Sequence, residues 1–136
     1  MMRAIAEAQT TRAMPNVSRS LVAVVDDDES VRESLPDLLR QFGFAVYAFP
    51  SAEAFLASES LSETRCLLLD VAMPGMTGPA LRQELSRRGW TIPVVFITAH
   101  ADERIRREAI DSGAVECLFK PFTESAVLDA LILALR

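Results

Sequence analysis

Five short apolar runs alternate with five helical patterns along the chain, and this alternation constrains the fold most. The apolar runs cover residues 21–25, 45–49, 66–69, 92–98 and 115–119. Runs of this length, bounded by turn residues, predict buried strands. Because each strand is followed by a helix at an ordinary connection length, the sequence predicts a doubly wound α/β fold. Its five-stranded parallel sheet should carry five helices, distributed over both faces.

The helical stretches are marked by apolar residues that recur at helical spacing and by residues that favour helix ends. We expect helices over 30–42, in a short segment after Ser51, from Pro79 up to Gly89, over 101–112 and from Thr123 to Leu135. Pro36 lies within the first helix and predicts a kink, because proline removes one backbone hydrogen bond. Residues 58–64 are expected to be a polar connection.

The length of 136 residues and the hydrophobic fraction of 50% fit one domain with a sizeable core. Residues 1–19 lack a sustained apolar period, and we expect them to form a flexible N-terminal tail. Residues 20–136 are then the folded domain. No apolar run approaches the length of a membrane span, so we expect no membrane partner.

Charge and cysteine usage narrow the class of protein further. A net charge of -5 argues against direct nucleic-acid binding by this chain. Cys66 and Cys117 lie in predicted strands and have no metal-binding or redox spacing. We interpret both as core thiols in a reducing compartment, and we predict a cytoplasmic protein.

Polar side chains follow four of the predicted strands at the point where each strand ends. Asp26 and Asp27 follow the first strand, Asp70 the third, Thr98 the fourth and Lys120 the fifth. In a doubly wound sheet these carboxyl ends converge on one crevice. Because three gathered carboxylates repel one another, a cation must bind among them. Oxygen ligands with room for water favour Mg²⁺ over a Ca²⁺ cage.

The same residues suggest phosphoryl transfer. Asp70, the most central carboxylate, could act as a nucleophile and become an acyl phosphate. The Thr98 hydroxyl would donate to a phosphoryl oxygen, while the ion and Lys120 would offset its charge. Lys120 is the only lysine among the 14 lysine and arginine residues, which suggests that a compact ammonium is needed there.

Four motifs, in order, resemble the receiver domain of two-component response regulators. They are V-V-D-D-D-E-S at 24–30, L-L-L-D-V-A-M-P-G-M-T-G at 67–78, V-F-I-T-A at 95–99 and F-K-P-F at 119–122. The resemblance extends over about 21–136. The amino-acid sequence around residues 51–55 and 113–116 is most similar to that of receivers of the nitrogen-fixation regulator subgroup.

The resemblance implies a flavodoxin-like, CheY-like sheet of strand order 2-1-3-4-5 with Asp70 as phosphoacceptor. By position, Asp27, Asp70 and the backbone carbonyl of Ala72 would bind Mg²⁺, and Asp26 would hold a metal-bound water. Thr98 would contact the phosphoryl group.

Lys120 would also contact the phosphoryl group, and the resemblance implies a cis peptide bond between Lys120 and Pro121. The phosphoryl donor would be a phosphohistidine on a sensor histidine kinase or a phosphotransfer protein. The chain would change conformation on phosphorylation to signal to a partner.

One position departs from the family pattern. Receivers usually carry an aromatic residue three places before the lysine, where it turns inward on activation, and this chain has Cys117 there. Cysteine cannot act as that rotamer switch. Either the signal passes through Phe119 and the helix over 101–112, or coupling is weak.

Two other functions stay open at this point, and one surface is left to explain. The chain could be a receiver-like binding module that works without phosphorylation, or a hydrolase of the phosphoaspartyl type. The hydrolase would need a second carboxylate two residues after Asp70, where Ala72 stands. The last helix is apolar on nearly every side, which indicates either deep packing beside a missing C-terminal neighbour or, as we favour, a homodimer or partner surface.

Overall fold

The computed structural model describes residues 20–136, and the predicted tail over 1–19 lies outside the described residues. Within them the chain forms one five-stranded sheet. Its strands are β1 (Leu21–Val25), β2 (Ala45–Phe49), β3 (Thr64–Asp70), β4 (Val94–Thr98) and β5 (Glu116–Phe119). All neighbouring strands are parallel, in the order β2-β1-β3-β4-β5. The predicted fold class and strand order are therefore confirmed.

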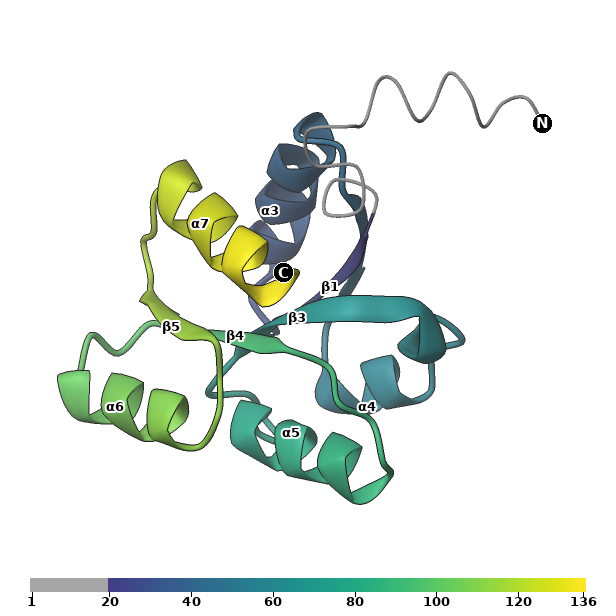
Figure 1. Ribbon diagram of the computed structural model, residues 1–136, viewed down its shortest axis with the longest axis vertical. Helices are drawn as coiled ribbons and strands as arrows, with labels where there is room; N and C mark the ends of the chain where they lie inside the picture. Colours follow the sequence, from purple (N-terminus) through teal and green to yellow (C-terminus); the bar gives the residue numbers. More distant parts are fainter. Residues whose placement is uncertain (1–19) are drawn as a thin grey trace.

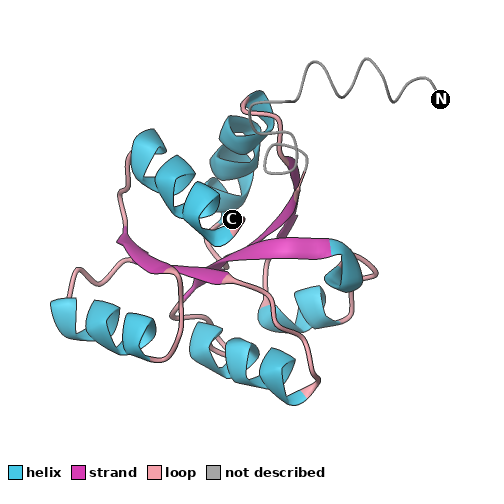
Figure 2. Ribbon diagram, viewed as in Figure 1, coloured by secondary structure: helices cyan, strands magenta, loops and turns pink. Residues whose placement is uncertain are grey.

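Helices cover both faces of this sheet (Figures 1 and 2). They are α3 (Glu29–Gln41), α4 (Ala52–Leu56), α5 (Gly78–Arg87), α6 (Glu103–Asp111) and α7 (Glu124–Ala134). Helices α3 and α7 lie on one face, and α4, α5 and α6 lie on the other (Figure 1). Side chains from Asp28, Ser51, Thr77, Asp102 and Thr123 accept a backbone N–H at the five helix starts. These polar caps explain where each helix begins.

Alternate residues of each strand supply two separate hydrophobic cores. Val24 and Leu68 belong to the core under α3 and α7, whereas Val25 and Leu69 belong to the core under α4, α5 and α6. All four are fully buried. Strands covered on both faces are apolar throughout, which is why the sequence presented them as continuous runs.

Several predicted boundaries are wrong by a few residues. The fourth strand begins at Val94 rather than residue 92, because Pro93 has no N–H to donate to a ladder. The segment predicted as a polar connection over 58–64 contains a 3₁₀ helix, Leu61–Glu63, and β3 begins at Thr64. Smaller differences place α6 at Glu103–Asp111 and β5 at Glu116–Phe119.

Two further features bear on the sequence predictions. Pro36 lies buried inside α3, which continues from Glu29 to Gln41 without a break. Among the helices described between residues 20 and 136, none combines the length and the apolar character needed to cross a bilayer.

The last helix, α7, packs one side against the sheet and leaves another side open. Val127, Ala130 and Leu131 are buried in the core shared with α3. Leu133 projects outward and keeps 47% of its surface exposed. The contrast fits the prediction that a helix apolar on nearly every side has more apolar surface than one domain can cover.

Candidate functional site

The carboxyl ends of the strands bring the predicted site residues together. Asp26 directly follows β1, Asp70 and Thr98 are the last residues of β3 and β4, and Lys120 directly follows β5. Because these strands lie side by side in the sheet, the four side chains reach one crevice. Asp26, Asp70 and Thr98 are 0%, 5% and 1% exposed. Asp27 lies at the exposed mouth.

Asp26 is fixed by its surroundings on three sides. Its backbone N–H donates to the Phe49 carbonyl at 3.1 Å, and its Oδ1 accepts the Asp28 N–H at 2.9 Å. The Arg32 guanidinium donates to the Asp26 carbonyl at 3.0 Å. Oδ2 lies 3.0 Å from Lys120 Nζ but has no hydrogen bond of good geometry within the described residues. This oxygen can therefore accept a further donor, such as a metal-bound water.

Three carboxylates form a cluster that fits a hard cation. One oxygen from each of Asp26, Asp27 and Asp70 lies within 4.8 Å of the other two. The cluster offers only oxygen ligands, and Mg²⁺ prefers such ligands in a small number with room for water. The donor set and the spare lone pairs on Asp26 Oδ2 fit Mg²⁺.

Charge within the crevice perturbs both Asp70 and Lys120. Burial, and then the negative charge of Asp26, raises the pKa of Asp70 to about 7, although Lys120 acts in the opposite direction. Burial works to lower the pKa of Lys120, but the nearby carboxylates of Asp26 and Asp70 outweigh it and raise that pKa. The ammonium lies 3.0 Å from Asp26 Oδ2 and 4.0 Å from Asp70 Oδ2. It is therefore held chiefly by Asp26 and remains within reach of Asp70.

The Thr98 hydroxyl donates to no acceptor within the described part of the chain, so its proton can serve a ligand. Its Oγ1 accepts the His100 N–H at 3.1 Å, and its carbonyl accepts the Lys120 N–H at 2.8 Å. The second bond also fixes the start of the segment after β5. The Lys120–Pro121 peptide bond is cis, as the resemblance implied.

The loop between Asp70 and α5 carries Ala72, the predicted source of a carbonyl ligand. Its two ends are tied by the Val71 N–H, which donates to Ile97 O at 2.9 Å, and by the Gly78 N–H, which donates to Val71 O at 3.0 Å. At Gly78 a Cβ atom would collide with the Asp70 backbone carbonyl, so the close approach of the chain requires glycine.

Glu53, on α4, reaches the middle of this loop. Its Oε2 accepts the Met76 N–H at 3.2 Å. The adjacent Gly75 has φ of +75°, and a Cβ there would lie 3.0 Å from the same carboxylate oxygen. Glu53 therefore holds the loop from outside the crevice.

At the position where receivers usually carry the switch aromatic, β5 has a small thiol side chain. Cys117 is fully buried and paired with Phe96 across β4 and β5. Burial raises the pKa of the Cys117 thiol, so it is inert at neutral pH. Phe119 lies half-buried under the Arg106 guanidinium, which is 5.0 Å from the ring centroid.

Three contributors to the site were missed at the level of sequence: Arg32, Glu53 and Gly78. Arg32 and Glu53 looked like ordinary helix residues, because their contacts lie six and 23 positions away along the chain. In the sequence, Gly78 stood only as the last residue of the motif at 67–78. No feature of the neighbouring sequence marks these three residues as contributors to the site.

Comparison with known proteins identifies the family. Residues 22–132 match the model of the response regulator receiver domain. Nodulation protein W of Bradyrhizobium diazoefficiens is 43% identical over 117 residues, which cover 86% of this chain and 52% of that protein. The transcriptional regulatory protein FixJ of Azorhizobium caulinodans is 42% identical over 110 residues, or 81% of this chain and 52% of that protein.

Solved structures agree with these relatives. The crystal structure of FixJ-N superposes with a TM-score of 0.75 at 39% identity and covers 85% of this chain and 92% of its own. The response regulator StyR gives a TM-score of 0.78 at 47% identity, over 86% of this chain and 59% of its own. The chain spans about half the length of the curated relatives it matches. With a family match over nearly all the described residues, a shared fold and the acidic crevice in place, this chain belongs to the response regulator receiver domain family.

Proposed function

We propose that Asp70 accepts a phosphoryl group from a phosphohistidine, on a sensor histidine kinase or a phosphotransfer protein, in a Mg²⁺-dependent reaction. The observation that carries this proposal is the arrangement at the end of β3. There the Asp70 carboxylate lies within 4.8 Å of two other carboxylate oxygens and 4.0 Å from an ammonium. The phosphorylated domain then signals to a partner in the cytoplasm.

In the transfer, an oxygen of Asp70 attacks the phosphorus atom in line with the leaving imidazole. The new P–O bond forms as the P–N bond breaks, and the electron pair of that bond returns to the imidazole nitrogen. The Thr98 hydroxyl donates to a phosphoryl oxygen, and the Lys120 ammonium pairs with another. Asp27, Asp70 and the Ala72 carbonyl would hold Mg²⁺, with Asp26 on a metal-bound water. The ion, when bound, supplies charge neutralisation at the phosphoryl oxygens.

The domain catalyses only its own phosphorylation and dephosphorylation under this proposal. A phosphoaspartyl hydrolase would place a general acid two residues after its nucleophile, and Ala72 offers none. The absence of turnover of a generic phosphate ester, alongside self-phosphorylation, would separate the two functions.

Intact mass measurement tests the chemistry directly. The chain is incubated with acetyl phosphate and Mg²⁺, and we expect a phosphate-sized gain that hydroxylamine removes, because acyl phosphates react with that nucleophile. Asp70→Asn and a sample with EDTA should show no gain. Asp37→Asn, an exposed site on α3, is the matched control and should be phosphorylated like the wild type. A gain that persists in Asp70→Asn would refute the assignment.

A second candidate is a binding module that works without phosphorylation, and Cys117 favours it. A small buried thiol replaces the aromatic that the family uses as a switch. If the wild type is phosphorylated yet its backbone amide spectrum changes only within the crevice, the binding module is the better description. Changes that extend to α6 and Phe119 would favour the phosphorylation switch.

We place the partner surface on α7. Leu133 is 47% exposed, and Leu128 and Ile132 beside it are only partly buried. This strip suits a second copy of the chain or a partner protein. Analytical ultracentrifugation with and without beryllofluoride tests the homodimer, and a monomer under both conditions would exclude it.

A further inference from the structure

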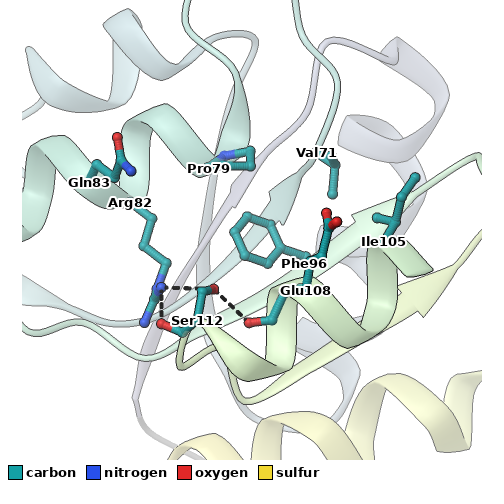
Figure 3. Close-up of a pocket in the computed structure, with 9 residues that line it drawn as sticks. Val71, Pro79, Arg82, Gln83, Phe96, Ile105, Glu108 and Ser112 are labelled. Carbon is teal, nitrogen blue, oxygen red and sulfur yellow. Dashed lines mark hydrogen bonds between the residues drawn. The ribbon is translucent and has the colours of Figure 1, made fainter. Parts of the chain in front are cut away.

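A hollow separate from the acidic crevice lies between α5 and α6 (Figure 3). Its volume is about 290 Å³. Val71 and Phe96 line it from the sheet side, and Ile105 and Ala109 line it from α6. An apolar cavity of roughly 150 Å³ is enough to bind benzene, so this one has room for a ring with a short substituent.

The carboxylate of Glu108 lies at the rim of the hollow. Figure 3 shows the Glu108 side chain turned toward the hollow, beside the Phe96 ring. Among the described residues, Glu108 takes part in no side-chain hydrogen bond and no ion pair. Its charge is therefore available to a ligand.

The cation on the opposite side of the rim is already engaged. Arg82 Nη1 donates to the Ser112 carbonyl at 2.7 Å and to Ser112 Oγ at 3.3 Å, which ties α5 to the end of α6. A Cβ atom at Gly113 would lie 2.6 Å from Arg82 Nη2, so the guanidinium is packed against the Gly113 backbone. Because the Arg82 donors are directed at Ser112 and the Gly113 backbone, the charged group that faces the hollow is the Glu108 carboxylate.

Helix α6, which forms one wall of the hollow, is the least buried of the described α-helices. Every other α-helix in the described part of the chain has at least two buried residues, whereas α6 has none. A ligand that fills the hollow would add apolar contacts to the least anchored helix without displacing packed side chains.

We propose that this hollow binds a small molecule that combines an apolar ring with a protonated amine. The ring would lie against Val71, Phe96 and Ala109, and the ammonium would pair with the Glu108 carboxylate. Apolar burial supplies affinity, and the charge-assisted hydrogen bond selects the amine over an alcohol or an acid of similar size.

Three probes that differ mainly in charge test the proposal: 2-phenylethylamine, 2-phenylethanol and phenylacetate. Each is titrated into the ¹⁵N-labelled full chain without phosphodonor or Mg²⁺, so that the result is independent of the proposed phosphorylation. We expect the amine to shift the amides of Val71, Phe96 and Ala109 and to bind about fivefold more tightly than the alcohol, the most that an exposed ion pair usually contributes. Phenylacetate should bind least.

Charge removal at the rim is the deciding variant. Glu108→Gln should abolish the preference for the amine and leave the affinity for the alcohol unchanged. Asp111→Asn, at the exposed end of the same helix, is the matched control and should keep the preference. The proposal is overturned if the amine fails to saturate by about 10 mM, if the three probes bind equally, or if Glu108→Gln keeps the preference. Shifts confined to another surface would also overturn it.

Discussion

The bodies of the strands and their carboxyl ends play opposite parts in this domain. In β3, Leu67, Leu68 and Leu69 are fully buried and apolar, and the next residue, Asp70, is a buried carboxylate. The bodies stabilise the fold by hydrophobic burial. The ends gather like charges, and a pair of unit charges about 5 Å apart costs roughly 3 kcal/mol at an effective dielectric of about 20.

The strand bodies hold the domain together by apolar packing, whereas the strand ends must be stabilised against the repulsion between their carboxylates. Lys120 is the one cation within ion-pair distance of Asp26 and Asp70 among the described residues. Without it, or without a metal ion, the crevice would weaken the fold. Substitutions at the ends and in the bodies should therefore change stability in different ways.

Removal of the Lys120 charge should have the largest effect. Lys120→Met keeps most of the side chain but leaves Asp26, which is 0% exposed, without its ammonium. We expect a loss of about 3 to 5 kcal/mol in the free energy of unfolding, measured by urea titration without Mg²⁺.

A double variant sharpens this result. Adding Asp26→Asn to Lys120→Met removes the unpaired charge and should recover a large part of the loss, whereas Arg107→Met, at an exposed position on α6, should change stability very little. If Lys120→Met lost less than about 1 kcal/mol, the crevice would not depend on the ion pair.

A substitution in a strand body should come next. Leu68→Ala empties a fully buried position in the core under α3 and α7 and should cost about 3 kcal/mol. Leu133→Ala, at the exposed position on α7, is the matched control and should cost well under 1 kcal/mol. Equal losses for the two variants would contradict the burial on which the comparison rests.

At Asp70, removal of the charge should raise the free energy of unfolding rather than lower it. The native carboxyl keeps its proton up to a pKa of about 7, whereas the unfolded chain loses it near the ordinary value of 3.8. Between these values the native state binds more protons, so stability falls as pH rises. Asp70→Asn should flatten this dependence and stabilise the metal-free domain by about 1 to 2 kcal/mol at pH 8.

Thermal unfolding from pH 4 to pH 8 measures this effect, and Asp37→Asn serves again as the control. Addition of Mg²⁺ should stabilise the wild type more than Asp70→Asn, since the variant lacks one of the proposed Mg²⁺ ligands. An Asp70→Asn variant that is less stable at pH 8 than at pH 5 by as much as the wild type would rule out Asp70 as the source.

Glu53 should have the smallest effect on stability and a selective effect on the proposed Mg²⁺ site. Glu53→Ala removes the acceptor for the Met76 N–H, which is near the surface and can bond to water instead. We expect roughly a two- to tenfold weaker Mg²⁺ affinity by isothermal titration, while Glu53→Gln keeps a carbonyl acceptor and stays near the wild type. Equal affinity in all three proteins would exclude a role for Glu53 in placing the loop between Asp70 and α5.

The fold was predictable because its signals are local. The run from Val22 to Val25 and the run from Leu67 to Leu69 indicated buried strands, and caps such as Thr123 indicated helix starts. The predicted strand boundaries were wrong where a proline or a 3₁₀ turn took the place of strand-to-strand hydrogen bonds, as at Pro93 and Leu61.

Part of the site could also be predicted, since strand ends of a doubly wound sheet meet at one edge. That rule placed Asp26, Asp70, Thr98 and Lys120 together. It could not reveal that Lys120 lies nearer to Asp26 than to Asp70, because side-chain reach decides that distance.

The roles of Arg32 and Glu53 depend on tertiary contacts that no sequence period encodes. The hollow between α5 and α6 had no sequence signal either, because its lining comes from four separate elements or loops.

Gly78 has a consequence for how this domain can be altered. Because Gly78 has no side chain, its backbone can pass close to the Asp70 carbonyl. A Cβ atom placed there would also lie 3.2 Å from Phe96 Cε1. A methyl group at this position would push on the Asp70 backbone and on the Phe96 ring that lines the hollow together. Engineers who wish to retune either region separately should therefore leave residue 78 untouched and work from α4 or α6 instead.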